Sequence, residues 1–249
     1  MRLYLRFLCC LAFQPLTAVA APVGPLDVAS VVDRSGLIIA GSVLAVGTRK
    51  TTIPRNDGII AAYEITIRIT VMVVLKGQDP GPSVTVRYLL PEAYDPNFVA
   101  VPAPSYRICF LIRIADQWIF TDSTYPSAPG VPAADREAGM DPLDAVVRRL
   151  RDVLAGSATR NDKVEALAAL RSLPKRESVE AALLSDITNP DPSIRLDIVG
   201  ALLARGNTVG LRSAGAELMT SEPGLPAYVL HNLRVGISEG LPRRTHSPC

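Results

Sequence analysis

Lys76 and Gly77, at the end of the apolar run ITVMVVLKG, are the first candidates for chemistry, because a lysine beside glycines can hold phosphate. A phosphate loop of the Walker type requires GxxxxGK[ST], in which backbone N–H groups surround the phosphates before the lysine reaches them from the start of a helix. Here the lysine precedes the glycine, and a second alternating apolar pattern follows QDPGP. The order predicts a β-hairpin and not a phosphate loop.

Residues for metal binding or nucleophilic catalysis are sparse. The two histidines are His231, in a helical pattern, and His246, near the end of the chain, and no GxSxG motif occurs. Asp27, Asp141 and Asp191 stand where helix N-caps are expected. We therefore predict a protein that is not an enzyme and that has no metal site and no cofactor.

A long connection offers the best candidate for partner binding. The segment PEAYDPNFVAVPAPS, residues 91–105, contains four prolines and is longer than an ordinary strand connection. A stiff loop loses little entropy on contact, so Tyr94 and Phe98 are predicted to be binding anchors. The alternative is that both aromatic rings fold back and cover one end of the β domain.

Residues 1–20 have the pattern of a secretory signal. Arg2 and Arg6 precede an apolar run, and Ala18-Val19-Ala20 fits the small-x-small rule for cleavage, so the mature chain is expected to start at Ala21. The sequence thus predicts a secreted or periplasmic protein. No later apolar stretch is long enough for a membrane span.

Charge and cysteine content limit the partners. Without Arg2 and Arg6 the 26 basic residues fall to 24, equal to the 24 acidic ones, and they form no basic stripe, so nucleic acid is not expected as a partner. Cys109 and Cys249 would remain after cleavage, too few for a disulfide framework, and a bridge between them stays an open alternative.

Residues 26–123 show the two-residue period of β-strands after one short helix that begins at Asp27. Gly41 and Gly47 interrupt the first strand and indicate bulges or a close approach of backbones. A strand over residues 59–75 would span roughly 50 Å and must bend. Residues 106–114, YRICFLIRI, and 117–122, QWIFTD, complete the predicted strands.

Residues 124–140 are rich in proline, show no apolar period and are predicted to be a linker. Residues 141–239 then show helical periods, and residues 240–249 form a polar tail. The predicted helices begin at Asp141 and continue at residues 161–172, 177–187, 192–204, 209–220 and 226–237.

The helical half contains a weak internal repeat. Lys163, Ala166, Ala169 and Leu170 recur 32 residues later as Arg195, Ile198, Ala201 and Leu202. This pattern resembles HEAT-type helical repeats, in which a capped helix carries a basic residue near its start and a small residue before leucine near its end. The alternative is an ordinary helical bundle.

The β half resembles the netrin-like and metalloprotease-inhibitor-like OB-type barrels of secreted proteins. The likeness rests on LIIAGSVLAV after a helix, on the long strand that ends in VVLKG, and on YRICFLIRI. It implies a small β-barrel, with a seven-strand sandwich as the alternative. The inhibitors place an N-terminal cysteine on the protease zinc, whereas this chain has Ala21-Pro22-Val23 there, so the resemblance does not extend to protease inhibition.

The predicted fold class is therefore α+β, an N-terminal OB-like barrel followed by an all-helical HEAT-like domain. The predicted function is a secreted or periplasmic non-enzymatic adaptor that engages protein partners. The alternative is an inhibitor or regulator of an extracellular enzyme that acts through the barrel loops.

Overall fold

The computed structural model describes residues 27–55, 58–91, 104–122, 126–132, 139–207, 209–210 and 213. The predicted signal sequence and tail, the binding loop with Tyr94 and Phe98, both histidines and Cys249 lie outside these residues. Among the helices that are described, none is both long and apolar enough to cross a membrane.

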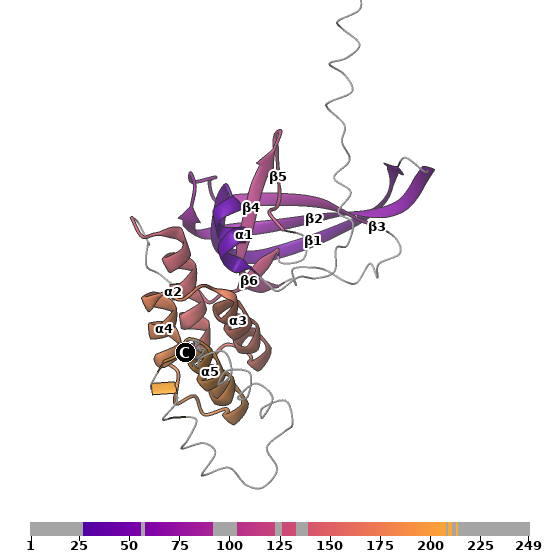
Figure 1. Cartoon of the computed structure of the whole chain (residues 1–249). Helices are drawn as coiled ribbons and strands as arrows, with labels where there is room; N and C mark the ends of the chain where they lie inside the picture. Colours follow the sequence, from indigo (N-terminus) through magenta and orange to yellow (C-terminus); the bar gives the residue numbers. More distant parts are fainter. Residues whose placement is uncertain are drawn as a thin grey trace, which may run out of the picture.

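The fold is mixed α+β, with a sheet built by the N-terminal half and a helical layer built by the C-terminal half (Figure 1). The helices are α1 (Val28–Arg34), α2 (Pro142–Ala155), α3 (Arg160–Ser172), α4 (Glu177–Leu184) and α5 (Pro192–Ala204). The strands are β1 (Leu37–Arg55), β2 (Gly58–Lys76), β3 (Ser83–Pro91), β4 (Ser105–Ile114), β5 (Gln117–Phe120) and β6 (Ser127–Pro129).

The pairings of five strands form a closed cycle. β1 pairs with β2 and β2 with β3, both antiparallel, and β3 meets β5 in parallel at Val86 and Trp118. β5 pairs with β4, and β4 returns to β1 through residues 37–43. The predicted hairpin between β2 and β3 is confirmed, because strand pairing flanks Lys76-Gly77 on both sides of the turn.

Part of the segment predicted to be a linker belongs to the sheet. Ser127–Pro129 form β6, which pairs with Arg107, Ile108 and Cys109 of β4. Three residues are too few to show a two-residue period, and one alanine and one proline add little apolar signal. The strand exists because β4 offers an edge, which is a property of the tertiary structure.

Two large hydrophobic clusters fill the described part of the molecule, beside a small third cluster of Leu196, Val199 and Leu203 in α5. The cluster inside the strand cycle is formed by Leu37, Ile39, Val43, Ile65, Ile67, Ile69, Val84, Val86, Cys109, Leu111 and Phe120. The larger cluster lies between the sheet and the helices, and it joins side chains of α1, β1, β2, β4 and β6 to those of α2–α5. The core is thus continuous across the predicted boundary between the two halves.

Two bulges in β2 explain why its alternation breaks after Val71. Opposite β1, the register skips Met72 and Leu75, so that Val71 and Val73 pair with adjacent residues. A bulge turns two successive side chains to the same side. As a result Val73 and Leu75 join the cluster beneath the helices, while Val74 packs against the other cluster.

The predicted role of the strand glycines is confirmed at Gly41 and is wrong at Gly47. A Cβ atom on Gly41 would lie 2.1 Å from the carbonyl oxygen of Thr70, and the register shifts next to it. At Gly47 the nearest atom is 4.0 Å away and the pairing is regular. The space at Gly47 opens toward the surface of the sheet.

The predicted N-caps are confirmed. The carboxylate of Asp27 accepts from the N–H of Ser30, that of Asp141 from residues 143 and 144, and that of Asp191 from residues 193 and 194. Such caps satisfy backbone donors that a helix leaves open at its start. Helix starts were therefore readable from local sequence.

Candidate functional site

Lys76, the residue that first suggested chemistry, stabilises a helix end. Its Nζ donates hydrogen bonds to the carbonyl oxygens of Val32 at 2.7 Å and Asp33 at 2.9 Å, in the last turn of α1. A positive charge there complements the helix dipole and satisfies open carbonyl groups. The bulge at Leu75 turns Lys76 toward α1.

Gly77 has an equally structural role. Its φ is +91°, and a Cβ atom there would lie 2.5 Å from the carbonyl oxygen of Gly36. Any L side chain would therefore be strained and would collide with the segment between α1 and β1. The Lys-Gly pair joins the end of β2 to the end of α1.

The described residues offer no obvious catalytic centre. They include no group of three or more His, Cys, Asp or Glu side chains that could hold a metal ion. Cys109 is fully buried, and this burial raises the pKa of its thiol to about 12, although the nearby charge of Arg107 acts in the opposite direction. Its thiolate is thus scarce at neutral pH, which removes it as a nucleophile.

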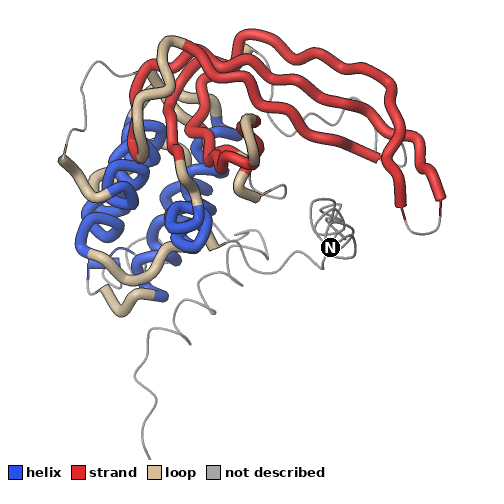
Figure 2. Tube along the Cα trace, turned by 90° about the horizontal axis from the view of Figure 1, so that it is seen from above, coloured by secondary structure: helices blue, strands red, loops and turns tan. Residues whose placement is uncertain are grey.

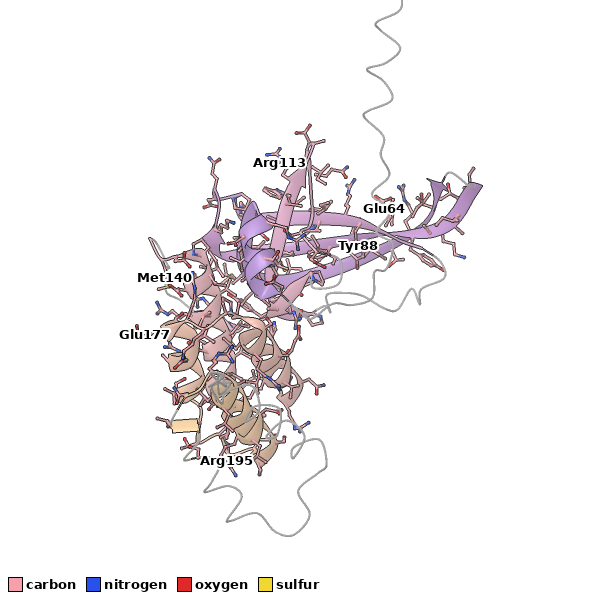
Figure 3. The ribbon with its side chains drawn as sticks, in the orientation of Figure 1. Glu64, Tyr88, Arg113, Met140, Glu177 and Arg195 are labelled. Carbon is pink, nitrogen blue, oxygen red and sulfur yellow. The ribbon has the colours of Figure 1, made fainter. Side chains whose placement is uncertain are left out.

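A groove of about 750 Å³ lies where the sheet meets the helical half. It is lined by residues 71–77 of β2 and the turn that follows it, by Asp79, Gly81 and Pro82 of that turn, and by Gly139, Met140 and Pro142 before and in α2. We call this the junction groove. Figure 3 places Met140 beside the sheet at the top of the helical layer.

One wall of the junction groove is a strand edge. β3 pairs with β2 only as far as the pair Thr70 and Ser83, and the N–H of Val71 donates to the carbonyl oxygen of Pro82 at 3.0 Å. From Met72 to Lys76 the structure gives β2 backbone pairing to β1 alone, among the described residues. An edge of this kind can add an extended peptide through main-chain hydrogen bonds.

Two methionines supply apolar contact surface at the groove. Met72 is 57% exposed and Met140 is 38% exposed, and both line the groove. Methionine is unbranched and polarizable, so it adapts to varied apolar surfaces. The polar groups of the groove, Lys76 and Asp79, are of opposite charge. The groove can therefore hold an extended polypeptide, with main-chain pairing along β2 and apolar contacts beside it.

Sequence reasoning missed the buried arginines. Arg107 is 6% exposed, donates to Ser127 Oγ at 3.2 Å and to both carboxylate oxygens of Glu165, and lies 3.6 Å from Asp162. It thereby ties β4 and β6 to α3. Arg149 of α2 is 1% exposed. By alternation Arg107 shares a face of β4 with Cys109 and Leu111, and both faces of β4 are covered, one by each cluster.

Comparisons with known proteins place the chain in no family: no family model matches it, and neither a curated protein nor a solved structure was found to be similar.

Proposed function

We propose that this protein is a secreted or periplasmic, non-enzymatic binding protein that engages protein partners, and that the junction groove is its binding site. The observation that carries the proposal is the edge of β2 from Met72 to Lys76, which lies open in a groove lined by the exposed side chains of Met72 and Met140. The partner is a polypeptide with an extended segment, because only a strand supplies matching main-chain groups.

Export is part of this proposal and rests on residues 1–20, whose basic start, apolar run and Ala18-Val19-Ala20 end have the pattern of a signal sequence.

We also propose that the strands form an OB-type barrel. The closed cycle β1-β2-β3-β5-β4 supports this, since an open sheet or a two-sheet sandwich would leave its end strands unpaired. The helix α1, which contacts β4, and the bulged strand β2 agree with the resemblance to netrin-like modules. The barrel supplies a rigid support for the edge at the junction groove.

For the helical half we propose HEAT-like stacking. α3 contacts α5 and α2 contacts α4, so each helix lies against the helix two positions later. Arg160 at the start of α3 binds the Asp191 cap of α5 at 2.9 Å, and Arg176 before α4 binds the Asp141 cap of α2 at 3.2 Å. The repeated positions Ala166, Ala169 and Leu170 are buried, as are Ile198, Ala201 and Leu202.

Residue-specific photo-crosslinking tests the binding site. A benzophenone amino acid is placed at Met72, at Met140 or, as the control, at Val164, which is 41% exposed on α3 and does not line the groove. The proposal predicts that positions 72 and 140 crosslink the same polypeptide in an envelope fraction. The control position should not crosslink it.

The captured polypeptide is then purified and its binding is measured directly. Met72→Asp should weaken binding by about tenfold or more, since apolar contact is replaced by a hydrated charge, while the exposed position leaves the melting temperature unchanged. Equal crosslinking from Val164, or unchanged affinity of Met72→Asp, would reject the groove. If the polypeptide is an enzyme that is slowed by the bound protein, the alternative function of an enzyme regulator is favoured.

A further inference from the structure

β1, β2 and β3 extend beyond the strand cycle as a three-stranded arm. β1 leaves β4 after Val43, and β3 touches β5 only at Val86, whereas β1 and β2 pair with each other as far as Arg55 and Gly58. Figures 1 and 2 show these strands reaching away from the helices. Along β2, the arm lies before Thr70 and the junction groove lies after it.

The register places arginines from all three strands on one face of this arm. In one row across the arm, Arg49 of β1, Glu64 of β2 and Leu89 of β3 lie opposite one another. In the next row, Thr66 of β2 lies opposite Arg87 of β3. Arg68 is two residues beyond Thr66 on β2, so its side chain points to the same face. Residues that are scattered singly in the sequence are thus brought together; we call them the arginine face.

The arginine face carries uncompensated charge. Arg49 forms an ion pair with Glu64, which is the one acidic residue among the opposed positions named above. Arg68 and Arg87 are exposed, and the structure gives neither of them a hydrogen bond or an ion pair with another described residue. Two positive charges therefore remain available to an anionic partner.

Gly47 makes room between the arginines. It occupies the row with Thr66 and Arg87, and its missing side chain leaves a hollow of about 330 Å³ lined also by Thr48, Arg49 and Glu64. The lining includes Arg49 and Arg87, with their guanidinium groups, and Thr66 on the same face. This donor set suits a phosphate oxygen cluster, which arginine binds through paired N–H groups.

Two observations select the kind of partner. Among the described residues, the aromatic rings of this region, Tyr63 and Tyr88, pack against the inner cluster, so the described part of the face offers no platform on which bases could stack. Leu44 and Leu89 are 56% and 51% exposed and stand apart from each other among the charges, without the central aromatic cluster of a protein interface. Dispersed apolar side chains with arginines suit the headgroup region of a membrane.

We propose that the arginine face lies on the surface of a membrane that contains anionic phospholipids, with Arg68 and Arg87 on the phosphates and Leu44 and Leu89 at the acyl boundary. This contact is separate from the junction groove and holds the groove beside the membrane.

Vesicle sedimentation of the full chain tests the proposal. The probes are vesicles of phosphatidylcholine with and without phosphatidylglycerol. Arg2 and Arg6 in residues 1–20 also favour anionic vesicles, but they are common to the wild type and all variants, so the difference between variants reports the arginine face. The wild type should prefer the anionic vesicles, and salt should weaken the preference. Arg68→Gln with Arg87→Gln should lower the preference about 25-fold, since each surface charge contributes about fivefold.

The matched control is Arg34→Gln with Arg113→Gln, which removes the same charge from exposed side chains away from the arginine face (Arg113 is labelled in Figure 3). It should retain the preference for anionic vesicles. Equal loss in the control pair, or equal binding of the wild type to both vesicles, would overturn the proposal. So would binding of poly-glutamate through Arg68 and Arg87 without vesicle binding, which would identify an acidic protein as the partner. Unchanged melting temperatures establish that both variants are folded.

Discussion

At the scale of single residues, several basic side chains act as caps for elements distant in sequence. Lys76 binds the last turn of α1, and Arg205 donates from Nη2 to the carbonyl oxygens of Leu170 and Leu173 at the end of α3, at 2.8 and 3.0 Å. Each places a cation where a helix ends in open carbonyl groups. Basic residues of this fold therefore connect elements, in addition to making the surface soluble.

Lys76→Met should lower the free energy of unfolding by about 2 kcal/mol, because two hydrogen bonds from a charged donor are lost while the methylene stem is kept. Urea denaturation followed by circular dichroism measures the change. Arg68→Met is the control, since Arg68 is exposed and has no partner among the described residues, and it should stay within about 0.5 kcal/mol of the wild type. Equal stability of Lys76→Met and the control would show that the Lys76 contacts with α1 contribute nothing.

At the scale of elements, the helix starts are linked to one another by charge. The carboxylate of Asp191 accepts from the hydroxyl and N–H of Ser193, from the N–H of Ile194 and from Arg160 of α3. The hydrogen bond from the Ser193 hydroxyl is the main reason that the pKa of Asp191 is lowered to about 2, and Arg160 adds to the effect. Capping and stacking therefore depend on the same ionised group.

This lowered pKa predicts acid sensitivity. An aspartate in an unfolded chain has a pKa of about 3.9, so Asp191 holds its proton less tightly in the folded state than in the unfolded chain. The stabilisation that ionised Asp191 gives to the fold is therefore complete above about pH 4. The stabilisation is lost as pH falls from about 4 to about 2. Asp191→Ala should lower the free energy of unfolding at neutral pH by about 1 kcal/mol through loss of the cap. The free energy of unfolding of this variant should also change less with pH over that interval than that of the wild type.

Asp191→Asn separates the two contributions, because asparagine also caps helices but carries no charge. It should keep most of the neutral stability and show the shallower pH dependence. Denaturant titrations at several acidic pH values provide the measurement. A pH dependence identical to that of the wild type would mean that Asp191 does not titrate as its contacts require.

At the scale of the whole molecule, the sheet and the helices share one core. The larger cluster runs from α1 and the strands into α2, α3, α4 and α5, and Arg107 binds Glu165 across the same boundary. Such a shared core couples the unfolding of the two halves. Residues 124–140 therefore separate two sequence patterns, but the hydrophobic core is continuous between the two halves.

We expect both halves to unfold in one transition. Trp118, the one tryptophan of the chain, reports on the sheet by fluorescence, and far-ultraviolet circular dichroism reports mainly on the helices. The two denaturation curves should coincide. Glu165→Gln should lower the free energy of unfolding by about 1–3 kcal/mol, because the buried guanidinium of Arg107 loses the carboxylate that accepts two of its hydrogen bonds and keeps only Asp162 at 3.6 Å.

Glu177→Gln is the matched control, since Glu177 is exposed in the first turn of α4 and forms no ion pair with a described residue of the sheet. It should leave both curves nearly unchanged. Separate midpoints for fluorescence and circular dichroism in the wild-type protein would show that the shared cluster does not couple the halves.

The sequence by itself determined the features that depend on near neighbours. Apolar period and N-cap residues located α1 and the starts of α2 and α5, and turn residues after Lys76 located the hairpin between β2 and β3. A cap acts over about three residues and a turn over about four, so each signal lies within one short stretch of chain. The mixed α+β class followed from the change of period.

Only the tertiary structure decided what distant segments do to one another. The bulges at Met72 and Leu75 arise where β2 must serve two clusters, and β6 exists because β4 offers it an edge. Arg107 is buried because α3 lies over it and supplies Glu165 as its partner. The junction groove and the arginine face are likewise products of register and packing. Contacts between residues far apart in the chain leave no local pattern, because the geometry that joins them is set by the fold as a whole.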